Sequence, residues 1–358
     1  MPRASSPSAS RRSTRWRTLA LGLLAGAIVV ALAGGAWVRA LWHPYKGYAE
    51  PERFVDVPRG AGVSTIADTL ARAGIVRDRW SFRVAARLAG AERRLKAGEY
   101  RFDRPQSAVE VVARLARGDV FLRQLTFPEG LTIAEMARTF EEQGFGTAET
   151  FVAAARSVHL VRDLDPVAVD LEGYLFPDTY GLPRSATATD LVDQMVRRFK
   201  AVWQKVAAAG PAAGSRSVRE IVTLASLVEE ETAHPDERAI VAGVYANRLR
   251  IGMGLQCDPT VIYALRRAGR YTGNLTRADL AFDSPYNTYR YAGLPPGPIA
   301  SPGRSSIEAA LAPAKVSYLY FVSRNDGSHV FSTTLAEHAN HVRRHQVEYF
   351  RRGRAQRR

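Results

Sequence analysis

VREIVTLASLVEEET, residues 218–232, joins an apolar helical face to three consecutive carboxylates. In a helix, the neighbours of a residue on its own face lie three, four and seven positions before it. For Glu231 all of these neighbours are apolar, whereas Glu229 and Glu230 each have a Ser or Thr among theirs. The stretch therefore predicts a helix over residues 218–231, with Glu231 continuing the face that packs into the core.

A carboxyl group on the core face of a helix has unusual acid–base properties. Burial and the negative end of the helix dipole both raise the pKa of such a group. A carboxylic acid that stays protonated near neutral pH is what a general acid requires. Glu231 is therefore our candidate catalytic residue, with Glu229 as a second candidate acid. A solvated acidic run without catalytic function is the alternative.

Two polar loops follow the next helix, which we expect over residues 235–249. The first loop presents Gln256 and Asp258, and the second contains Tyr286 and Asn287. Amide and carboxylate side chains hydrogen-bond to hydroxyl groups, and tyrosine rings offer flat apolar faces on which sugars stack. These loops suit sugar binding, although the same composition is typical of ordinary surface loops.

Other site chemistries find little support in the sequence. The single cysteine, Cys257, excludes an internal disulfide framework and a cysteine-based zinc site. His338, His341 and His345 share one helical face, but arginines are interleaved and no His-Glu-x-x-His pattern is present, so we expect no metal. Ser226 has no Gly-x-Ser-x-Gly setting, and the sequence has no glycine motif for phosphates or dinucleotides. We therefore expect no cofactor.

The formal net charge of +15 is concentrated in the two tails of the 358-residue chain. Five arginines and no acid precede Thr18, and seven arginines with one acid follow from Arg343 onward. The residues between the tails are only mildly basic, so they lack the basic face that nucleic-acid binding needs. We therefore expect no nucleic-acid partner. The hydrophobic content of 46% is enough for a sizeable core.

Residues 18–38 form an uncharged run rich in Leu, Ala, Val and Gly. A helix of this length reaches about 30 Å, which is enough to cross the core of a bilayer. Because arginines crowd its N-terminal side, the positive-inside rule predicts a cytoplasmic tail over residues 1–17. We expect a single-pass anchor in the inner (cytoplasmic) membrane, with the rest of the chain periplasmic or otherwise extracytoplasmic. A cleaved signal peptide is the alternative, but this run is longer than the usual signal core.

The exported part is predicted to have an α+β fold in two pieces. After a linker over residues 39–51, short helical and extended patterns through residues 52–118 indicate a small α+β module. A mixed, helix-rich α+β domain over residues 119–342 contains the candidate site, and a basic tail covers residues 343–358. Strands are expected over residues 53–57, 96–102, 316–323 and 329–332, and a surface loop over residues 207–215.

Several long motifs, in the same order, resemble those of the MltG (YceG-like) family of endolytic murein transglycosylases. The resemblance runs from the anchor to about His341 and rests on KAGEYRF (96–102), EGYLFPD (172–178), ASLVEEET (225–232), NRLRIGM (247–253), LQCDPTVIY (255–263), YNTY (286–289), GLPPG (293–297) and YLYFV (318–322). The chain departs from the family at Cys257, where relatives usually carry Thr, and at Glu230, where many carry a basic residue.

The resemblance implies a membrane-anchored lyase that cuts nascent peptidoglycan strands internally and so terminates their elongation. Its parts would be a LysM-like module over residues 52–118 and a YceG-like catalytic domain over residues 119–342. The partners implied are the peptidoglycan glycan strands themselves and the penicillin-binding-protein synthases that make them.

The family motif places the essential glutamate on Glu231, in agreement with the helix-face argument. Glu231 would protonate the β-1,4 bond between MurNAc and GlcNAc and then take the proton of the muramic acid 6-hydroxyl, leaving a 1,6-anhydroMurNAc end. The residues implied around the sugars are Asn247, Gln256, Asp258, Tyr286 and Asn287.

Two alternatives remain at the level of the sequence. Hydrolysis by water normally needs two carboxylates, and Asp258 is the residue that would join Glu231 in a peptidoglycan glycoside hydrolase. A non-catalytic scaffold that binds the cell wall would need neither carboxylate.

Overall fold

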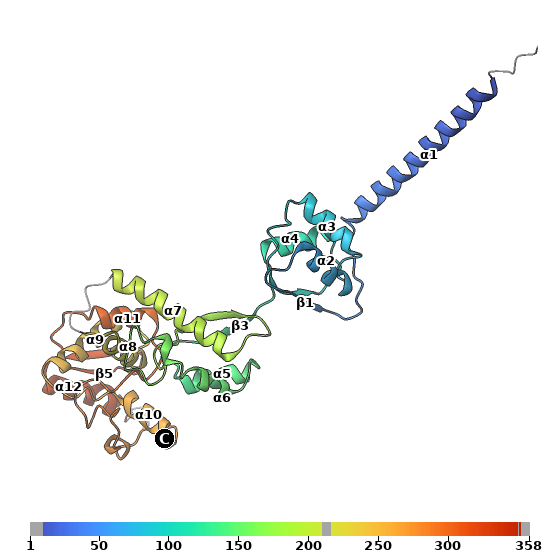
Figure 1. Ribbon diagram of the computed structural model, residues 1–358. Helices are drawn as coiled ribbons and strands as arrows, with labels where there is room; N and C mark the ends of the chain where they lie inside the picture. Colours follow the sequence, from blue (N-terminus) through green and yellow to red (C-terminus); the bar gives the residue numbers. More distant parts are fainter. Residues whose placement is uncertain (1–9, 210–215, 350, 352–358) are drawn as a thin grey trace, which may run out of the picture. The chain divides into compact units, whose positions relative to one another are not determined.

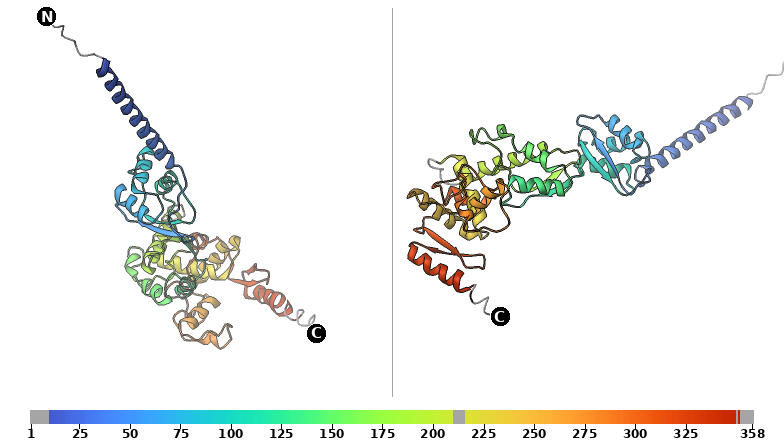
Figure 2. Two further views of the ribbon diagram at one scale, coloured as in Figure 1. Left: turned by 90° about the vertical axis from the view of Figure 1, so that its right-hand side faces the viewer. Right: turned by 90° about the horizontal axis from the view of Figure 1, so that it is seen from below.

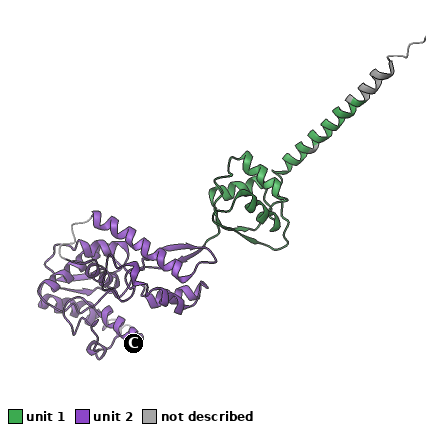
Figure 3. Cartoon of the chain, viewed as in Figure 1, with its two compact units in different colours: residues 1–122 green, residues 123–358 purple. Residues whose placement is uncertain are grey.

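The computed structural model of the chain describes residues 10–209, 216–349 and 351. It is a mixed, helix-rich α+β protein, as predicted (Figure 1). The chain divides into two compact units, residues 1–122 and residues 123–358 (Figure 3). Residues 1–9 of the predicted N-terminal tail, and residues 350 and 352–358 of the predicted C-terminal tail, lie outside the described residues.

The first unit begins with the long helix α1, Ser10–Ala40. Its segment Leu21–Ala40 is long and apolar enough to cross a membrane, by length and composition alone. The large apolar side chains described in this segment, such as Leu23 and Val30, are exposed rather than packed against protein. Among the described residues, α1 is the one helix that meets this test.

The rest of the first unit is a small α+β module with its own hydrophobic core. Its elements, in chain order, are β1 (Arg53–Val57), α2 (Val63–Arg72), α3 (Arg79–Leu88), β2 (Gly98–Phe102) and α4 (Ala108–Arg117). The two strands pair antiparallel, so the helices α2 and α3 connect neighbouring strands. Asp78 and Ser107 begin α3 and α4 by accepting backbone N–H groups that would otherwise have no partner.

The second unit begins with a strand pair that the sequence did not predict. Strands β3 (Arg123–Thr126) and β4 (Thr179–Leu182) pair antiparallel, and around them lie α5 (Ile133–Glu142), α6 (Ala148–Ala154) and α7 (Ala188–Ala209). Each strand has four residues, which is too short for an alternating pattern to stand out from the loops beside it. The expected loop over residues 207–215 begins instead as the end of α7, and its residues 210–215 lie outside the description.

Helix α8, Val218–Glu231, lies at the centre of the second unit. It is packed by α9 (Pro235–Arg250), α10 (Asp258–Arg267) and α11 (Arg304–Leu311), and residues 221–228 are all buried. A helix that is buried on every side needs a sequence that is apolar all round, which this stretch nearly is. The three glutamates therefore stand where α8 leaves the core.

A hairpin and a helix close the second unit. Strands β5 (Tyr320–Ser323) and β6 (His329–Ser332) pair antiparallel and pack against α12 (Leu335–Val342) (Figure 2). The strand predicted over residues 316–323 is shortened to its last four residues. The reason is that the carbonyls of Val316 and Tyr318 accept hydrogen bonds from Asn247 of α9 rather than from another strand.

Candidate active site

Glu231 is the last residue of α8, and its carboxylate is turned into the protein. Its Oε2 accepts a hydrogen bond from the Tyr245 hydroxyl at 3.0 Å and lies 3.5 Å from the Cys257 thiol. Tyr245 belongs to α9, and Cys257 immediately precedes α10, so three helices position this one carboxylate. Glu231 as a whole residue is half-buried, and its carboxyl group is the enclosed part.

The surroundings of Glu231 favour its protonated form. Burial raises the pKa of the carboxyl group, and the negative charge of Asp258 adds to the rise. The hydrogen bonds from Tyr245 and Cys257 and the nearby His329 lower the pKa, because they stabilise the charged form. Burial is the largest of these effects, so the pKa lies above its ordinary value, as a general acid requires.

Glu229, the second candidate acid, sits in a different environment. Its Oε1 accepts from Arg238 Nη2 at 2.9 Å, and its Oε2 accepts from the backbone N–H of Gly303 at 2.8 Å. The side chains of Glu229 and Arg238 are only 5% and 11% exposed, so this is a buried ion pair. Glu129 joins it from a loop before α5, with Oε2 3.5 Å from Arg238 Nη2. Glu229 is therefore held at the end of α8 by an ion pair and a backbone hydrogen bond.

Glu230 lies between these two residues and points elsewhere. The residue as a whole is exposed, yet its carboxylate is enclosed enough beside α5 that burial raises its pKa to about 7. The charge of Glu135 adds to this rise, and that of Arg266 opposes it. The three consecutive glutamates therefore have three separate sets of neighbours, as the helical geometry predicts.

The loop before α10 places Gln256 and Asp258 at the surface on either side of the buried Cys257. Gln256 has a φ of +49°, a left-handed conformation that strains a residue with a Cβ. The buried Arg248 holds this loop by donating to the carbonyl of Leu255, and Cys257 N donates to Thr288 Oγ1 at 3.0 Å. Strain that is maintained by such anchoring is typical of functional sites.

Asp258 opens α10, and its carboxylate faces a second tyrosine. The Tyr289 hydroxyl donates to Asp258 Oδ1 at 2.5 Å, and Asp258 as a residue remains exposed. Its negative charge acts on Glu231, since it contributes to the raised pKa of that residue. The structure therefore brings Asp258 near Glu231, and Gln256 is exposed in the segment that precedes it.

Of the other sequence-predicted residues, Asn287 and Asn247 use their side-chain amides within the protein, and Tyr286 packs its ring there. Asn287 is fully buried: its Nδ2 donates to the carbonyls of Leu280 and Phe282, and its Oδ1 accepts from Tyr289 N. Asn247 uses its Nδ2 at 2.8 Å and 3.0 Å on the carbonyls of residues 316 and 318. Tyr286 is half-buried, and its ring packs against that of Tyr263 at 5.0 Å between centroids.

Three residues of this region were not predicted from the sequence. Tyr245 is an aromatic residue on a helix and is typical of a core position, and nothing in its spacing indicates that its hydroxyl reaches Glu231. Tyr289 lies in a turn, and nothing in its spacing indicates that its hydroxyl reaches Asp258. Glu172 is a buried carboxyl group whose oxygens accept from Ile133 N at 3.0 Å and from the Tyr263 hydroxyl at 3.1 Å. Burial raises the pKa of Glu172 to about 8.

The histidines of the last helix are engaged with other side chains. The ring of His338 stacks on Tyr320 with 5.3 Å between centroids, and His341 Nδ1 lies 3.0 Å from Ser332 Oγ. Among the described residues, no group of three His, Cys, Asp or Glu side chains is arranged to hold a metal ion.

The sequence model of the YceG-like family matches residues 55–344, which is most of the chain. The chain belongs to the YceG-like family. The match includes the small module from β1 onward as well as the unit that contains Glu231.

Individual relatives agree with this assignment. The chain is 32% identical to an endolytic murein transglycosylase of Bacillus subtilis over 332 residues, covering 86% of this chain and 89% of that protein. It is 33% identical to an endolytic murein transglycosylase of Streptococcus pneumoniae over 328 residues, covering 81% of this chain and 58% of that longer protein. The crystal structure of a YceG-like protein from Listeria monocytogenes superposes with a TM-score of 0.54 at 30% identity, covering 82% of this chain and 99% of the other.

Proposed function

We propose that the protein is a lytic transglycosylase that cuts peptidoglycan glycan strands internally, with Glu231 as its acid and base. The observation that carries the proposal is the setting of the Glu231 carboxylate, which is enclosed by Tyr245 and Cys257 and has a raised pKa. The names of the relatives from Bacillus and Streptococcus support the same reaction and substrate.

In the proposed reaction one carboxyl group serves twice. Protonated Glu231 donates its proton to the oxygen that joins MurNAc to GlcNAc as the bond from C1 of MurNAc to that oxygen breaks. The Glu231 carboxylate then takes the proton of the MurNAc 6-hydroxyl, whose oxygen bonds to C1. The products are a 1,6-anhydroMurNAc end and a free 4-hydroxyl on GlcNAc, and Glu231 is protonated again. Water is not consumed, so no second carboxylate has to activate it.

The contacts of Glu231 support different roles for its two oxygens in this proposal. Tyr245 and Cys257 both direct their hydrogens to Oε2, which leaves Oε1 to carry the proton. In this arrangement Tyr245 is a positioning residue, because it orients the carboxylate without touching the sugar. Glu229, paired with Arg238, has a structural role in fixing the end of α8.

We propose that Gln256 and Asp258 contact the sugars, because both are exposed and flank Cys257, whose thiol lies at the catalytic carboxylate. Tyr286 is half-buried and would contribute part of a ring face. Asn247 and Asn287 act indirectly in this proposal, since their amides hold the segments on either side of the site. No cofactor or metal enters the reaction.

A hydrolase is the second candidate, and the position of Asp258 is the observation that favours it. Asp258 is exposed, and its charge acts on Glu231, as a second carboxylate of a glycoside hydrolase would. Against this candidate, Tyr289 already donates to Asp258 Oδ1 at 2.5 Å. The scaffold alternative gives no reason for enclosing a carboxyl group at the surface end of α8.

We further propose that α1 anchors the protein in the inner membrane, with the N-terminus cytoplasmic and the catalytic unit in the periplasm. The support is the apolar segment Leu21–Ala40 and the arginines that precede it. Residues 52–118 would act as a LysM-like carbohydrate-binding module, in keeping with the strand–helix–helix–strand order of β1 to β2. An anchored enzyme of this kind would work beside the penicillin-binding-protein synthases that release new strands.

Mass spectrometry of digested glycan strands tests the proposal. The wild-type chain, purified in detergent, is expected to yield anhydro ends, and Glu231→Gln is expected to yield no new ends while keeping its melting temperature. Reducing ends, heavier by one water, would support the hydrolase. Unchanged cleavage by Glu231→Gln would remove Glu231 from the chemistry.

A further inference from the structure

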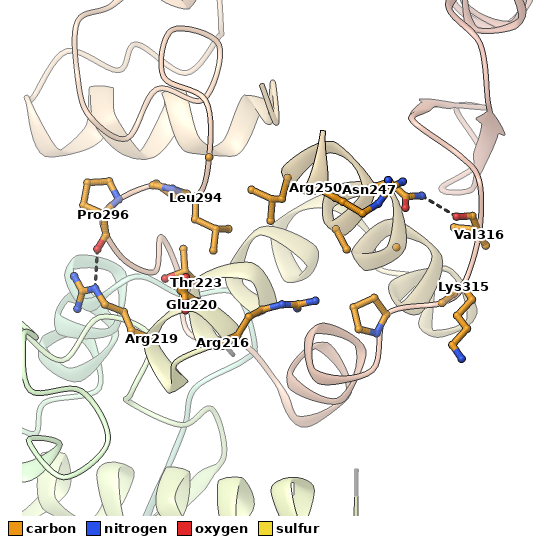
Figure 4. A pocket seen from close by; sticks show the side chains of 17 residues that line it. Arg216, Arg219, Glu220, Thr223, Asn247, Arg250, Leu294, Pro296, Lys315 and Val316 are labelled. Atoms are coloured by element: carbon orange, nitrogen blue, oxygen red, sulfur yellow. Dashed lines mark hydrogen bonds between the residues drawn. The ribbon is translucent and has the colours of Figure 1, made fainter. Parts of the chain in front are cut away.

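The second unit contains a cavity of about 910 Å³ that lies apart from Glu231. Its walls are the loop Gly293–Pro296 on one side and the segment Pro313–Val316 on the other, and α8 and α9 form the floor between them (Figure 4). Thr223 is the last residue of α8 that lines the cavity. Glu231 follows it by eight residues, which is about 12 Å along the helix.

Both walls of the cavity are fastened to its floor. On one side, Arg219 Nε donates to the carbonyl of Pro296 at 2.8 Å, and on the other Asn247 Nδ2 donates to the carbonyl of Val316 at 2.8 Å (Figure 4). Gly243 of α9 allows the second wall to approach closely, because a Cβ there would lie 2.5 Å from the carbonyl oxygen of Ala314. The cavity is therefore formed before any ligand arrives.

The lining of the cavity is strongly basic. It contains four cationic side chains, and Glu220 is the one carboxylate among the lining residues. Glu220 is already engaged, since its Oε2 accepts from Ser217 N at 2.7 Å and from Ser217 Oγ at 3.0 Å. The four cationic residues are Arg216, Arg219, Arg250 and Lys315.

Two of these cations have partners among the described residues. Arg219 pairs with Asp165, and Arg216 donates to the carbonyl of Ala310 at 3.1 Å. Within the part of the chain that the structure describes, no hydrogen bond or ion pair is made by the side chain of Arg250 or Lys315, and both residues are exposed. A rigid cavity with unpartnered cations is suited to an anionic ligand.

We propose that this cavity binds the acidic stem peptide that hangs from the muramic acid of the cut strand. This inference rests on the proposed function and adds to it a requirement for the peptide. The carboxylates of the peptide would pair with Arg250 and Lys315, and its alanine methyl groups would lie against Leu294 and the prolines of the walls.

The reach of a stem peptide agrees with this placement. A peptide of five residues spans at most about 17 Å when extended. This exceeds the distance of about 12 Å that separates Thr223 from Glu231 along α8. The length of an extended stem peptide is therefore sufficient for this separation along the helix.

The kinetic test compares strands that carry stem peptides with strands from which an amidase has removed them. The preference is the ratio of kcat/KM for strands that carry peptides to kcat/KM for strands that lack them. In the variant R250Q/K315Q this ratio is expected to be about tenfold lower than in the wild type. The control R156Q/R277Q removes the same charge from exposed residues that do not line the cavity, and it should keep the wild-type preference. An equal preference in R250Q/K315Q and wild type would overturn the inference.

A binding test separates this inference from the proposed reaction. Full-length Glu231→Gln in detergent is titrated calorimetrically with a muramyl tetrapeptide that has free carboxylates. Introducing the substitutions R250Q and K315Q into this chain should weaken binding about tenfold, and so should amidating the peptide. Binding that is insensitive to both changes, or that is displaced more strongly by poly(glycerol phosphate) than by the peptide, would refute the stem-peptide site. Cleavage by Glu231→Gln would instead refute the proposed reaction and leave the titration interpretable.

Discussion

The two ends of helix α8 place carboxylates in opposite electrostatic settings. At the first turn, Glu220 accepts from the backbone N–H and hydroxyl of Ser217, where the helix dipole favours negative charge. At the last turn, Glu231 receives its hydrogen bonds from a phenol and a thiol, and the helix dipole opposes negative charge. A glutamate therefore completes the helix cap at one end of α8, whereas at the other end the surroundings of a second glutamate favour its protonated form.

The largest effect should come from removing the acid at the last turn. Glu231→Gln keeps the shape of the side chain but cannot donate a proton, and we expect cleavage to fall about a thousandfold. Glu230→Gln, one residue earlier and exposed, should stay within about threefold of wild type. Turnover of labelled glycan strands measures both. Similar losses of turnover in the two variants would mean that cleavage depends on the total charge of the acidic run rather than on a single proton donor.

Glu229→Gln should act on stability instead, because it leaves Arg238 buried beside a neutral group. We expect the free energy of unfolding to fall by about 3 kcal/mol. Glu129 also lies near Arg238, but its side chain is 45% exposed. Glu129→Gln should therefore cost less than about 1 kcal/mol. Urea denaturation distinguishes the two, and equal costs would contradict the buried ion pair as the fixing contact of this helix end.

Tyr245→Phe removes a hydrogen bond that stabilises the charged form of Glu231. The pKa of Glu231, already raised by burial, should rise further. Because the acid must be protonated to act, the fall of kcat/KM on the alkaline side should move to higher pH, by about one pH unit. A pH–rate profile of wild type and variant measures this. A profile that moves to lower pH, or does not move, would show that Tyr245 does not act on the acid.

The smallest effect is expected at the first turn. Ser217→Ala removes the cap of α8, which should lower the free energy of unfolding by about 1 kcal/mol. Turnover measured well below the melting temperature should remain at the wild-type level, because Ser217 does not touch the site. Thermal unfolding gives the first quantity and a cleavage assay the second. A large loss of turnover without a loss of stability would contradict this prediction, because it would mean that Ser217 affects the reaction at Glu231.

The sequence predicted best where local periodicity decides the outcome. The neighbours of Glu231 follow from positions along one helix, so its inward face could be predicted without knowing what packs against it. Helices α8 and α9 and the strands β1, β2 and β6 were predicted for the same reason. The ladder of β3 and β4 joins segments more than fifty residues apart, and no local pattern in four residues reveals such a pairing.

It was harder to predict which polar side chains in loops face the site, because their direction depends on the tertiary packing of the whole unit. Asn287 and Gln256 look equally available in the sequence, yet Asn287 is buried inside its own loop and Gln256 is exposed in a strained turn. The hydroxyl of Tyr245 reaches Glu231 only because α9 packs back along α8. Side-chain type indicated the chemistry of the site, but tertiary packing chose which residues face it.

Digestion in water enriched in ¹⁸O tests the central claim most directly. If Glu231 passes one proton from the 6-hydroxyl to the leaving oxygen, the new MurNAc ends are anhydro sugars that contain no ¹⁸O from the solvent. A reducing end with ¹⁸O at C1 would show that water attacks, and would contradict the account.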